Sequence, residues 1–231
     1  MNSRSSVARL SDLPAPSRPR ERLLRHGPAA LTDAELLAIV LRTGTRGCNV
    51  VALAQRLLHQ FGGLRPLLAT DHDQLSNTPG IGPAKAAQLV ATLELARRSL
   101  AEELARGPVL NRPELVETYC ASILAHQKVE VCIALYFDNQ LRLITTEETS
   151  RGTLAQAAVY PREIVRSALH HHAASVVIAH NHPSGLAEPS RADLELTRHL
   201  REALALVDTR LIDHIIVAGK ETVSLARLGK L

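Results

Sequence analysis

Apolar positions at helical spacing, interrupted by glycine and proline, dominate the first half of the chain. The predicted helices cover residues 22–26, 36–41 and 50–61, a short stretch after Asp71, and a long final segment ending near residue 106. Thr32 and Glu35 have the spacing of a capping box, and Asn49 is a suitable helix cap. The pattern therefore predicts an all-helical domain over residues 21–107, behind a flexible arm at residues 1–20.

The second half has a different pattern, in which short β-branched runs alternate with helical segments. A linker is expected at residues 107–113. The predicted strands cover residues 129–137, 141–146, 175–179 and 211–217, with a short last strand near 223. The predicted helices cover residues 114–126, 161–172 and 190–207, and Pro161 is well suited to a first helical position. Residues 108–231 are therefore expected to form an α+β domain with a mixed, mostly antiparallel sheet flanked by helices.

Composition narrows the class of protein. The 231 residues are 45% hydrophobic and 22% charged, which is typical of globular domains and not of a disordered chain. No run approaches 18 apolar residues, and the N-terminus lacks an apolar signal segment, so we expect a cytoplasmic protein without membrane contact. The three cysteines, Cys48, Cys120 and Cys132, form no Cys-x-x-Cys pair and are expected to be reduced, buried side chains.

Charge is distributed unevenly along the chain. Residues 1–107 hold 14 Lys and Arg against 9 Asp and Glu, a net charge of +5, whereas residues 108–231 hold 13 against 14, a net charge of −1. A basic domain is a candidate surface for nucleic acid. An excess of this size also fits a helical domain with no such partner, so a motif is needed to decide.

A metal-site spacing stands at the centre of the second half. The strand at residues 175–179 runs into His180 and His182, whose side chains share a face because they are two residues apart on extended backbone. A turn follows, and Ser190 then opens a helix that brings Asp193 back on its first turn. Two imidazoles and a carboxylate form a three-ligand Zn²⁺ site with a fourth position for water, as in catalytic zinc sites.

Other interpretations exist for these and the remaining histidines. Ser190 and Asp193 also fit a simple helix N-cap pair, and histidines near a strand end are often ordinary surface residues. The run His170 to His172 is expected to be a solvated helix end, because consecutive helical residues point in different directions. His199 is expected on a helix surface. For His214 we favour a buried histidine bonded to its neighbour over a partner of the metal ligands.

A second informative stretch lies between two predicted helices. Pro79-Gly80-Ile81-Gly82 is similar to the helix-hairpin-helix motif of many DNA-repair proteins. Gly80 and Gly82 would let the backbone approach a phosphate at the start of the following helix, and Lys85 would add a positive charge. Such a motif reads no bases, so the partner would be DNA, bound weakly and without sequence preference. The alternative is a turn that serves only for packing.

The metal spacing resembles the JAMM (MPN-type) metalloprotease motif, and residues 181–185, Asn-His-Pro-Ser-Gly, resemble the bacterial RadC family in particular. Residues 41–48 also look like the N-terminal region of that family. The resemblance implies an MPN/JAMM-like fold, with Glu130 as general base beside the metal and Ser190 as the hydroxyl that stabilises an oxyanion. Glu163 and Glu188 are the competitors for the role of base.

Two functions follow from these features. The leading one is a zinc-dependent hydrolase of metallopeptidase or isopeptidase type, with an unknown peptide or isopeptide substrate, tethered to DNA by the helix-hairpin-helix domain. The alternative is a DNA-binding repair or recombination factor whose metal site is structural or acts on nucleic acid. Amide cleavage would favour the first, and DNA affinity without any peptide hydrolysis would favour the second.

Overall fold

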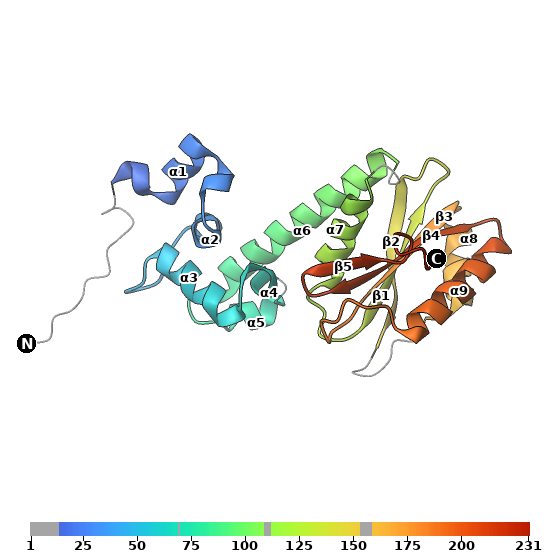
Figure 1. Ribbon diagram of the computed structural model, residues 1–231. Helices are drawn as coiled ribbons and strands as arrows, with labels where there is room; N and C mark the ends of the chain where they lie inside the picture. Colours follow the sequence, from blue (N-terminus) through green and yellow to red (C-terminus); the bar gives the residue numbers. More distant parts are fainter. Residues whose placement is uncertain (1–13, 69, 109–111, 153–158) are drawn as a thin grey trace, which may run out of the picture. The chain divides into compact units, whose positions relative to one another are not determined.

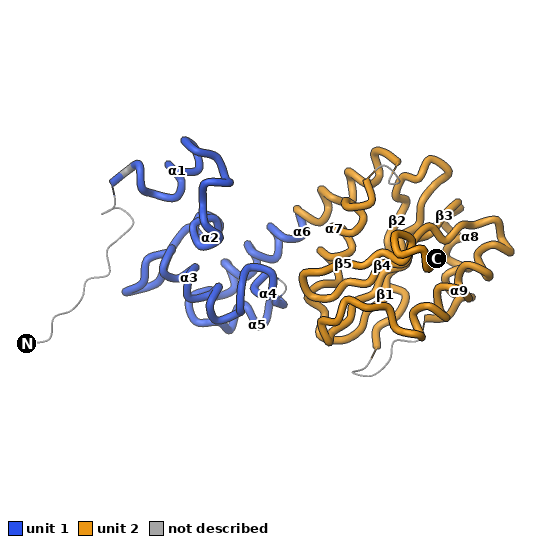
Figure 2. Tube along the Cα trace, in the orientation of Figure 1, with its two compact units in different colours: residues 1–95 blue, residues 96–231 orange. Residues whose placement is uncertain are grey.

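The computed structural model describes residues 14–68, 70–108, 112–152 and 159–231. Most of the predicted arm and part of the predicted linker therefore lie outside the described residues. The chain divides into two compact units, residues 1–95 and 96–231 (Figure 2). The division falls inside helix α6 (Gly82–Arg106), earlier than the boundary at residue 107 that the sequence indicates. The reason is that Leu100, Ala101 and Leu104 of this helix pack in the core of the second unit.

The first unit is helical. Its elements are a 3₁₀ turn at Ala15–Ser17, α1 (Pro19–His26), a 3₁₀ turn at Pro28–Ala30, α2 (Asp33–Leu41), α3 (Val50–Phe61), α4 (Leu64–Leu68), α5 (His72–Ser76) and the start of α6. The predicted capping box of Thr32 and Glu35 is present, and the Asn49 side chain caps α3. α1 begins two residues inside the predicted arm, with Pro19 in its first turn. Leucines of these helices form a common core.

The second unit is built on a five-stranded sheet. Its elements are α7 (Pro113–Leu124), β1 (Val131–Phe137), β2 (Leu143–Arg151), α8 (Pro161–His170), β3 (Ser175–Asn181), α9 (Arg191–Ala205), β4 (Arg210–Ala218) and β5 (Glu221–Ser224). The strand order is β2-β1-β3-β4-β5, and β3–β4 is the one parallel pair among them (Figure 1). The expected α+β class with a mostly antiparallel sheet is confirmed.

Each face of the sheet has its own apolar core. Odd-numbered residues of β1 and β3, such as Ile133 and Val177, pack with α7 and the last turns of α6. Even-numbered residues, such as Ala134 and Ile178, pack with α8 and α9 on the other face (Figure 1). Because side chains alternate between the two faces of a strand, His180, as an even-numbered residue of β3, lies on the face that α9 covers.

No helix within the described residues combines the length and the apolar character needed to cross a membrane. Cys120 and Cys132 are buried thiols, as expected from the sequence, whereas Cys48 is only half-buried.

Candidate metal centre

The predicted ligands converge at the point where β3 ends and α9 begins. His180 Nε2 lies 3.0 Å from His182 Nε2 and 3.2 Å from Asp193 Oδ1, and His182 Nε2 lies 3.4 Å from Asp193 Oδ2. Within the described residues, this trio is the group of histidine, cysteine and carboxylate side chains whose ligand atoms lie close enough to share one ion. His180 and Asp193 are buried, while His182 is partly exposed, so the site opens to solvent at His182.

A tight turn orients His182. The residues Pro183 to Gly185 reverse the chain, with Gly185 at φ +78° and its N–H bonded to the His182 carbonyl at 3.0 Å. This turn returns the Leu186 carbonyl oxygen to within 2.8 Å of His182 Nδ1. A carbonyl oxygen only accepts, so Nδ1 must carry the ring hydrogen, and the neutral ring presents the lone pair of Nε2 to the site.

A series of buried hydrogen-bonded groups also orients the His180 ring so that its Nε2 lone pair faces the site. Its Nδ1 lies 2.8 Å from His214 Nε2, and His214 Nδ1 lies 2.6 Å from the Thr197 hydroxyl oxygen. That hydroxyl donates to the Asp193 carbonyl at 2.6 Å and therefore accepts from His214 Nδ1–H. His214 Nε2 must then accept from His180 Nδ1–H, which leaves a lone pair on His180 Nε2.

The expectation for His214 is thus confirmed for its burial but wrong for the partner of its ring. Only its main-chain N–H bonds to the neighbouring Asp213 carboxylate, at 2.7 Å, whereas its ring contacts the candidate metal ligand His180. The strand register explains the contact between the two rings. Ile178 of β3 pairs with His214 of β4, so His214 lies on the face that α9 covers, together with Ile178 and His180. The sequence signal was a histidine inside an apolar strand, which needs a buried partner, but only the strand register could name it.

The arrangement fits a bound metal ion. Two nitrogen lone pairs and a carboxylate face one another at 3.0 to 3.4 Å, a repulsive arrangement unless a cation or a proton lies between them. Zinc bonds of about 2.0–2.1 Å in a tetrahedron would place ligand atoms about 3.3 Å apart. The observed separations match that spacing, and three protein ligands leave a fourth position open.

The pKa values reflect this geometry. Burial opposes ionisation of Asp193, but the hydrogen bonds that the His180 and His182 rings donate when Nε2 carries a proton outweigh it and hold the pKa of the carboxyl well below its usual range. The bond with Asp193 raises the pKa of His182. Burial and the neighbouring His180 lower the pKa of His214 to about 3, so its ring is neutral. The trio therefore attracts positive charge, while His214 remains an uncharged hydrogen-bonding partner.

Ser190 and Asp193 form the capping box that was the alternative interpretation of this pair. The Ser190 hydroxyl oxygen accepts from Asp193 N–H at 3.1 Å, and Ser190 N–H donates to Asp193 Oδ2 at 2.7 Å. The cap is therefore part of the candidate metal site, since it holds the carboxylate toward the histidines. Because the Ser190 hydroxyl oxygen acts as an acceptor in this cap, its O–H remains able to donate a hydrogen bond to a bound substrate.

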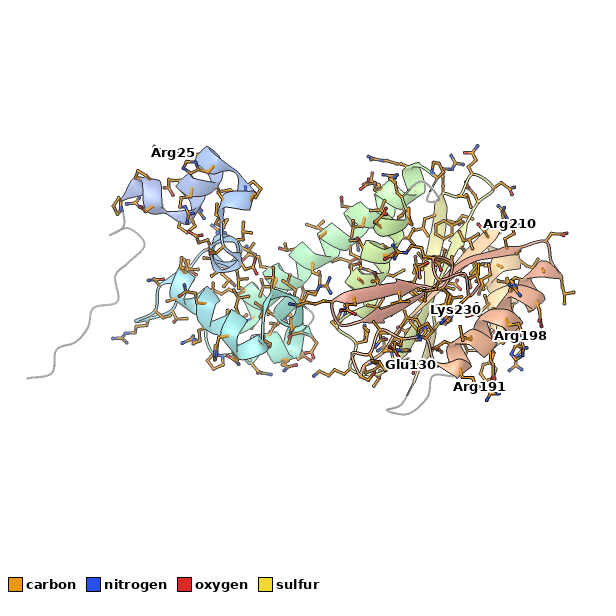
Figure 3. The ribbon with its side chains drawn as sticks, viewed as in Figure 1. Arg25, Glu130, Arg191, Arg198, Arg210 and Lys230 are labelled. Atoms are coloured by element: carbon orange, nitrogen blue, oxygen red, sulfur yellow. The ribbon has the colours of Figure 1, made fainter. Side chains whose placement is uncertain are left out.

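Glu130 lies at the same end of the sheet as the first turn of α9, where Figure 3 labels it near Arg191. β1 pairs with β3 so that Cys132 lies opposite His180, and Glu130 stands directly before β1, two residues ahead of Cys132. The Glu130 carboxylate contributes to the raised pKa of His182, which places it within electrostatic reach of the site. Its side chain is half-buried.

Asn181, to which we assigned no role of its own, fixes the segment that carries Glu130. Its side-chain oxygen accepts from Val131 N–H at 2.8 Å, and its amide nitrogen donates to the carbonyls of Val129 and Gln127 at 2.9 and 3.3 Å. The residue between His180 and His182 thus ties the end of β3 to the residues on both sides of Glu130. A buried asparagine inside a strand was the available sequence signal.

Most of the chain matches known protein families. The RadC-like JAB domain matches residues 110–230, and the UPF0758 N-terminal domain matches residues 10–87. The chain belongs to the RadC family. Among its relatives, the UPF0758 protein of Bordetella petrii is 58% identical over 96% of this chain and 98% of its own length. The UPF0758 proteins of Methylibium petroleiphilum and Halorhodospira halophila are each 56% identical, over 96% and 94% of this chain and 100% and 97% of their own lengths.

Among the described residues, the two competing glutamates and the histidines of α8 and α9 do not join the trio of this RadC chain. Glu163 forms ion pairs with Arg162 and Arg166 on α8, and Glu188 is exposed. His170, His172 and His199 are exposed, as expected. His171 is an exception to the predicted solvated helix end: it is half-buried, with Nε2 2.6 Å from the Glu147 carboxylate of β2. A helix end that packs on a neighbouring strand explains the difference.

The predicted hairpin at residues 79–82, called the glycine hairpin below, makes contacts within the helical unit of this RadC chain. Lys85 Nζ donates to the carbonyls of Gly80 and Gly44 at 3.1 and 3.3 Å, and burial lowers the pKa of this lysine. A Cβ on Gly80 would lie 2.7 Å from Leu53 Cδ1, whereas one on Gly82 would meet no atom within 4 Å. Residues 41–48 therefore pack against the hairpin, and Gly82 is the glycine with open space beside it.

Proposed function

We propose that this RadC-family protein is a zinc-dependent hydrolase of metallopeptidase or isopeptidase type. The observation that carries the proposal is the convergence of two oriented imidazole lone pairs and one buried carboxylate at tetrahedral spacing. His180, His182 and Asp193 would hold the ion. Bound there, zinc would supply Lewis-acid polarisation and would lower the pKa of a coordinated water toward 7.

The remaining groups of the site suit hydrolysis of an amide. Glu130 stands directly before β1 and contributes to the raised pKa of His182, and it would take a proton from the attacking water and deliver it to the leaving amine. Ser190 would donate its hydroxyl hydrogen to the oxyanion that forms on the substrate carbonyl. Asn181 would keep Glu130 in place through its three bonds to residues on both sides of Glu130. The partial exposure of His182 supports access of an extended chain from that side.

For the helical unit we propose weak, non-specific DNA binding. The support is the basic balance of residues 1–107, the exposed Arg42 and Arg46 beside the hairpin, and the open space at Gly82 where α6 begins. Lys85 would act indirectly, because its ammonium group bonds to two carbonyls of the hairpin and its neighbouring loop. The reduced cysteines are consistent with action in the cytoplasm.

The deciding experiment measures metal and amide cleavage together. Purified full-length protein is analysed for zinc by elemental analysis, and a fluorogenic peptide library is then incubated with wild type and with Glu130→Gln. We expect one zinc per chain in both proteins and cleavage only by wild type. Zinc without cleavage of any peptide, accompanied by DNA affinity, would favour the alternative repair or recombination factor. A protein that takes up no zinc would overturn the proposal.

A further inference from the structure

We propose that His214 and Thr197 are positioning residues that keep the His180 ring in the tautomer required for metal binding. The inference rests on the proposed metal function of the site and extends it to two residues outside the ligand set. Neither residue belongs to the His-x-His…Ser-x-x-Asp spacing, and their side chains approach His180 only through the packing of β4 and α9 against β3.

The direction of every hydrogen bond in this chain of groups is set by its last member. The Asp193 carbonyl can only accept, so the Thr197 hydroxyl donates to it and accepts from His214. His214 then has a hydrogen on Nδ1 and a lone pair on Nε2. The His180 ring must donate from Nδ1, which leaves Nε2 as a metal ligand. One main-chain carbonyl thus fixes two imidazole tautomers.

Burial makes these hydrogen bonds necessary for keeping each ring in one tautomer. His214 has an exposed fraction of 0%, Thr197 of 1% and His180 of 3%, so bulk water does not offer substitute partners. Without the Thr197 hydroxyl, His214 loses the acceptor for its Nδ1 hydrogen and is no longer held in that tautomer. If the hydrogen moves to His214 Nε2, His180 Nδ1 becomes the acceptor, and the His180 hydrogen shifts to Nε2. That hydrogen would occupy the position of the metal.

The same chain of groups links two ligands through their supporting elements. Thr197 lies four residues after Asp193 on α9, so its hydroxyl bonds to the main chain of the residue whose carboxylate faces His180. β3, β4 and α9 are therefore joined by one chain of hydrogen bonds that runs from the His180 ring to the main chain of Asp193. Partners of this kind orient ligating histidines, and their loss commonly lowers metal affinity about 10- to 100-fold.

The first test compares Thr197→Val with Thr197→Ser in the full-length protein. Valine keeps the branched shape and removes the hydroxyl, whereas serine keeps the hydroxyl. Zinc affinity is measured by competition with a chromogenic chelator. We expect Thr197→Val to bind zinc at least about 10-fold more weakly than wild type, and Thr197→Ser to stay within about 2-fold. Equal affinity of wild type and Thr197→Val would overturn the inference.

A second pair of variants tests the other residue. His214→Gln can place an amide oxygen where Nε2 accepts, whereas His214→Leu offers no acceptor for the His180 hydrogen. We expect the glutamine variant to retain more zinc affinity than the leucine variant. Equal losses in two folded variants, as judged by circular dichroism, would show that His214 acts only through packing and would contradict the inference.

The third measurement reads the tautomer directly and needs no metal. Histidine-selective ¹⁵N NMR of the metal-free protein, with the His180 signals assigned by their loss in His180→Gln, reports which ring nitrogen carries the hydrogen. We expect the Nδ1–H form in wild type and Thr197→Ser, and a gain of the Nε2–H form in Thr197→Val. An unchanged tautomer would refute the inference. Failure of wild type to bind zinc would instead refute the proposed function, and the NMR comparison would still decide the role of Thr197.

Discussion

The glycine hairpin of the helical unit and the histidine site of the sheet unit use their polar groups in opposite ways. At the hairpin, Lys85 and Arg56 donate to main-chain carbonyls of their own unit. At the site, the outer nitrogens of His180 and His182 bond to protein partners, so that their inner nitrogens point at a common position with Asp193.

This difference shows what separates a ligand site from a packed turn. Hydrogen bonds at the hairpin satisfy its charges and join it to residues 41–48, which stabilises the unit without reference to a ligand. Hydrogen bonds around the trio leave three electron-rich atoms facing one another, which only a positive species can satisfy. The metal proposal therefore stands on internal geometry, whereas the DNA proposal stands on charge and open space.

The largest expected effect is loss of zinc on removing two ligands. His180→Ala combined with His182→Ala leaves only Asp193, and we expect stoichiometric zinc in wild type to fall to background by elemental analysis. His199→Ala is the matched control, because His199 is exposed on α9, the helix that also carries Asp193. Full zinc content in the double variant would place the metal elsewhere in the chain.

The next effect concerns the rate of amide cleavage. Glutamine at position 130 keeps the shape of glutamate and removes its basicity, so Glu130→Gln should retain zinc and lose about 100-fold or more of the hydrolytic rate. Glu163→Gln and Glu188→Gln should leave the rate unchanged, because the first residue pairs with arginines on α8 and the second is exposed. An unchanged rate in Glu130→Gln would pass the role to one of these two glutamates.

The pH dependence of zinc affinity gives a smaller, graded effect. Zinc needs a neutral His182, and Asp193 raises the pKa of this ring above its usual value of about 6.5. As the pH falls through the raised pKa, a proton competes with the metal, and the zinc affinity should fall up to about 10-fold per pH unit.

The onset of this decline distinguishes the site from ordinary histidines, which would lose zinc only below about pH 6. In the metal-free protein the same proton stabilises the fold: this contribution is fully present below about pH 6.5 and is lost as the pH rises through the raised pKa of His182. Zinc titrations from pH 5.5 to 8.5 measure the onset. An affinity that stays constant down to pH 6 would contradict the raised pKa.

The smallest expected effects are changes in stability when either of the two hairpin glycines is replaced. Both have positive φ, +99° at Gly80 and +67° at Gly82, but only a Cβ on Gly80 would collide with Leu53 and Arg56. Gly80→Ala should therefore lower the free energy of unfolding by more than Gly82→Ala, for which about 1 kcal/mol is expected from the backbone alone. Thermal unfolding of the full-length variants measures this difference.

DNA affinity then tests the hairpin itself. Gly82→Ala should weaken binding of duplex DNA several-fold in a low-salt anisotropy titration, because a methyl group would stand where a phosphate approaches. Wild-type affinity in a folded Gly82→Ala variant would mean that the hairpin serves packing alone. Binding that does not weaken as salt increases would rule out a phosphate-based contact.

Local pattern alone determined the fold class, the helix caps and the three candidate metal ligands. Helix and strand periods, the capping box at Thr32 and the cap at Asn49 depend on residues close in sequence. His180 and His182 share a strand face, and Asp193 follows a recognisable helix start, so their convergence needed only one turn between strand and helix. Such short-range features can be inferred because the chain itself fixes their geometry.

Only the tertiary structure decided which residues support the site. His214 reaches His180 because parallel β4 pairs with β3 in one register, and Thr197 joins them because α9 packs on that face. Asn181 bonds to residues 50 positions away, and Lys85 bonds to Gly44 across the helical unit. These contacts depend on strand register and on helix docking, which are set by the burial of whole apolar faces. The residues involved are far apart in the sequence, so no local spacing predicts that they contact one another.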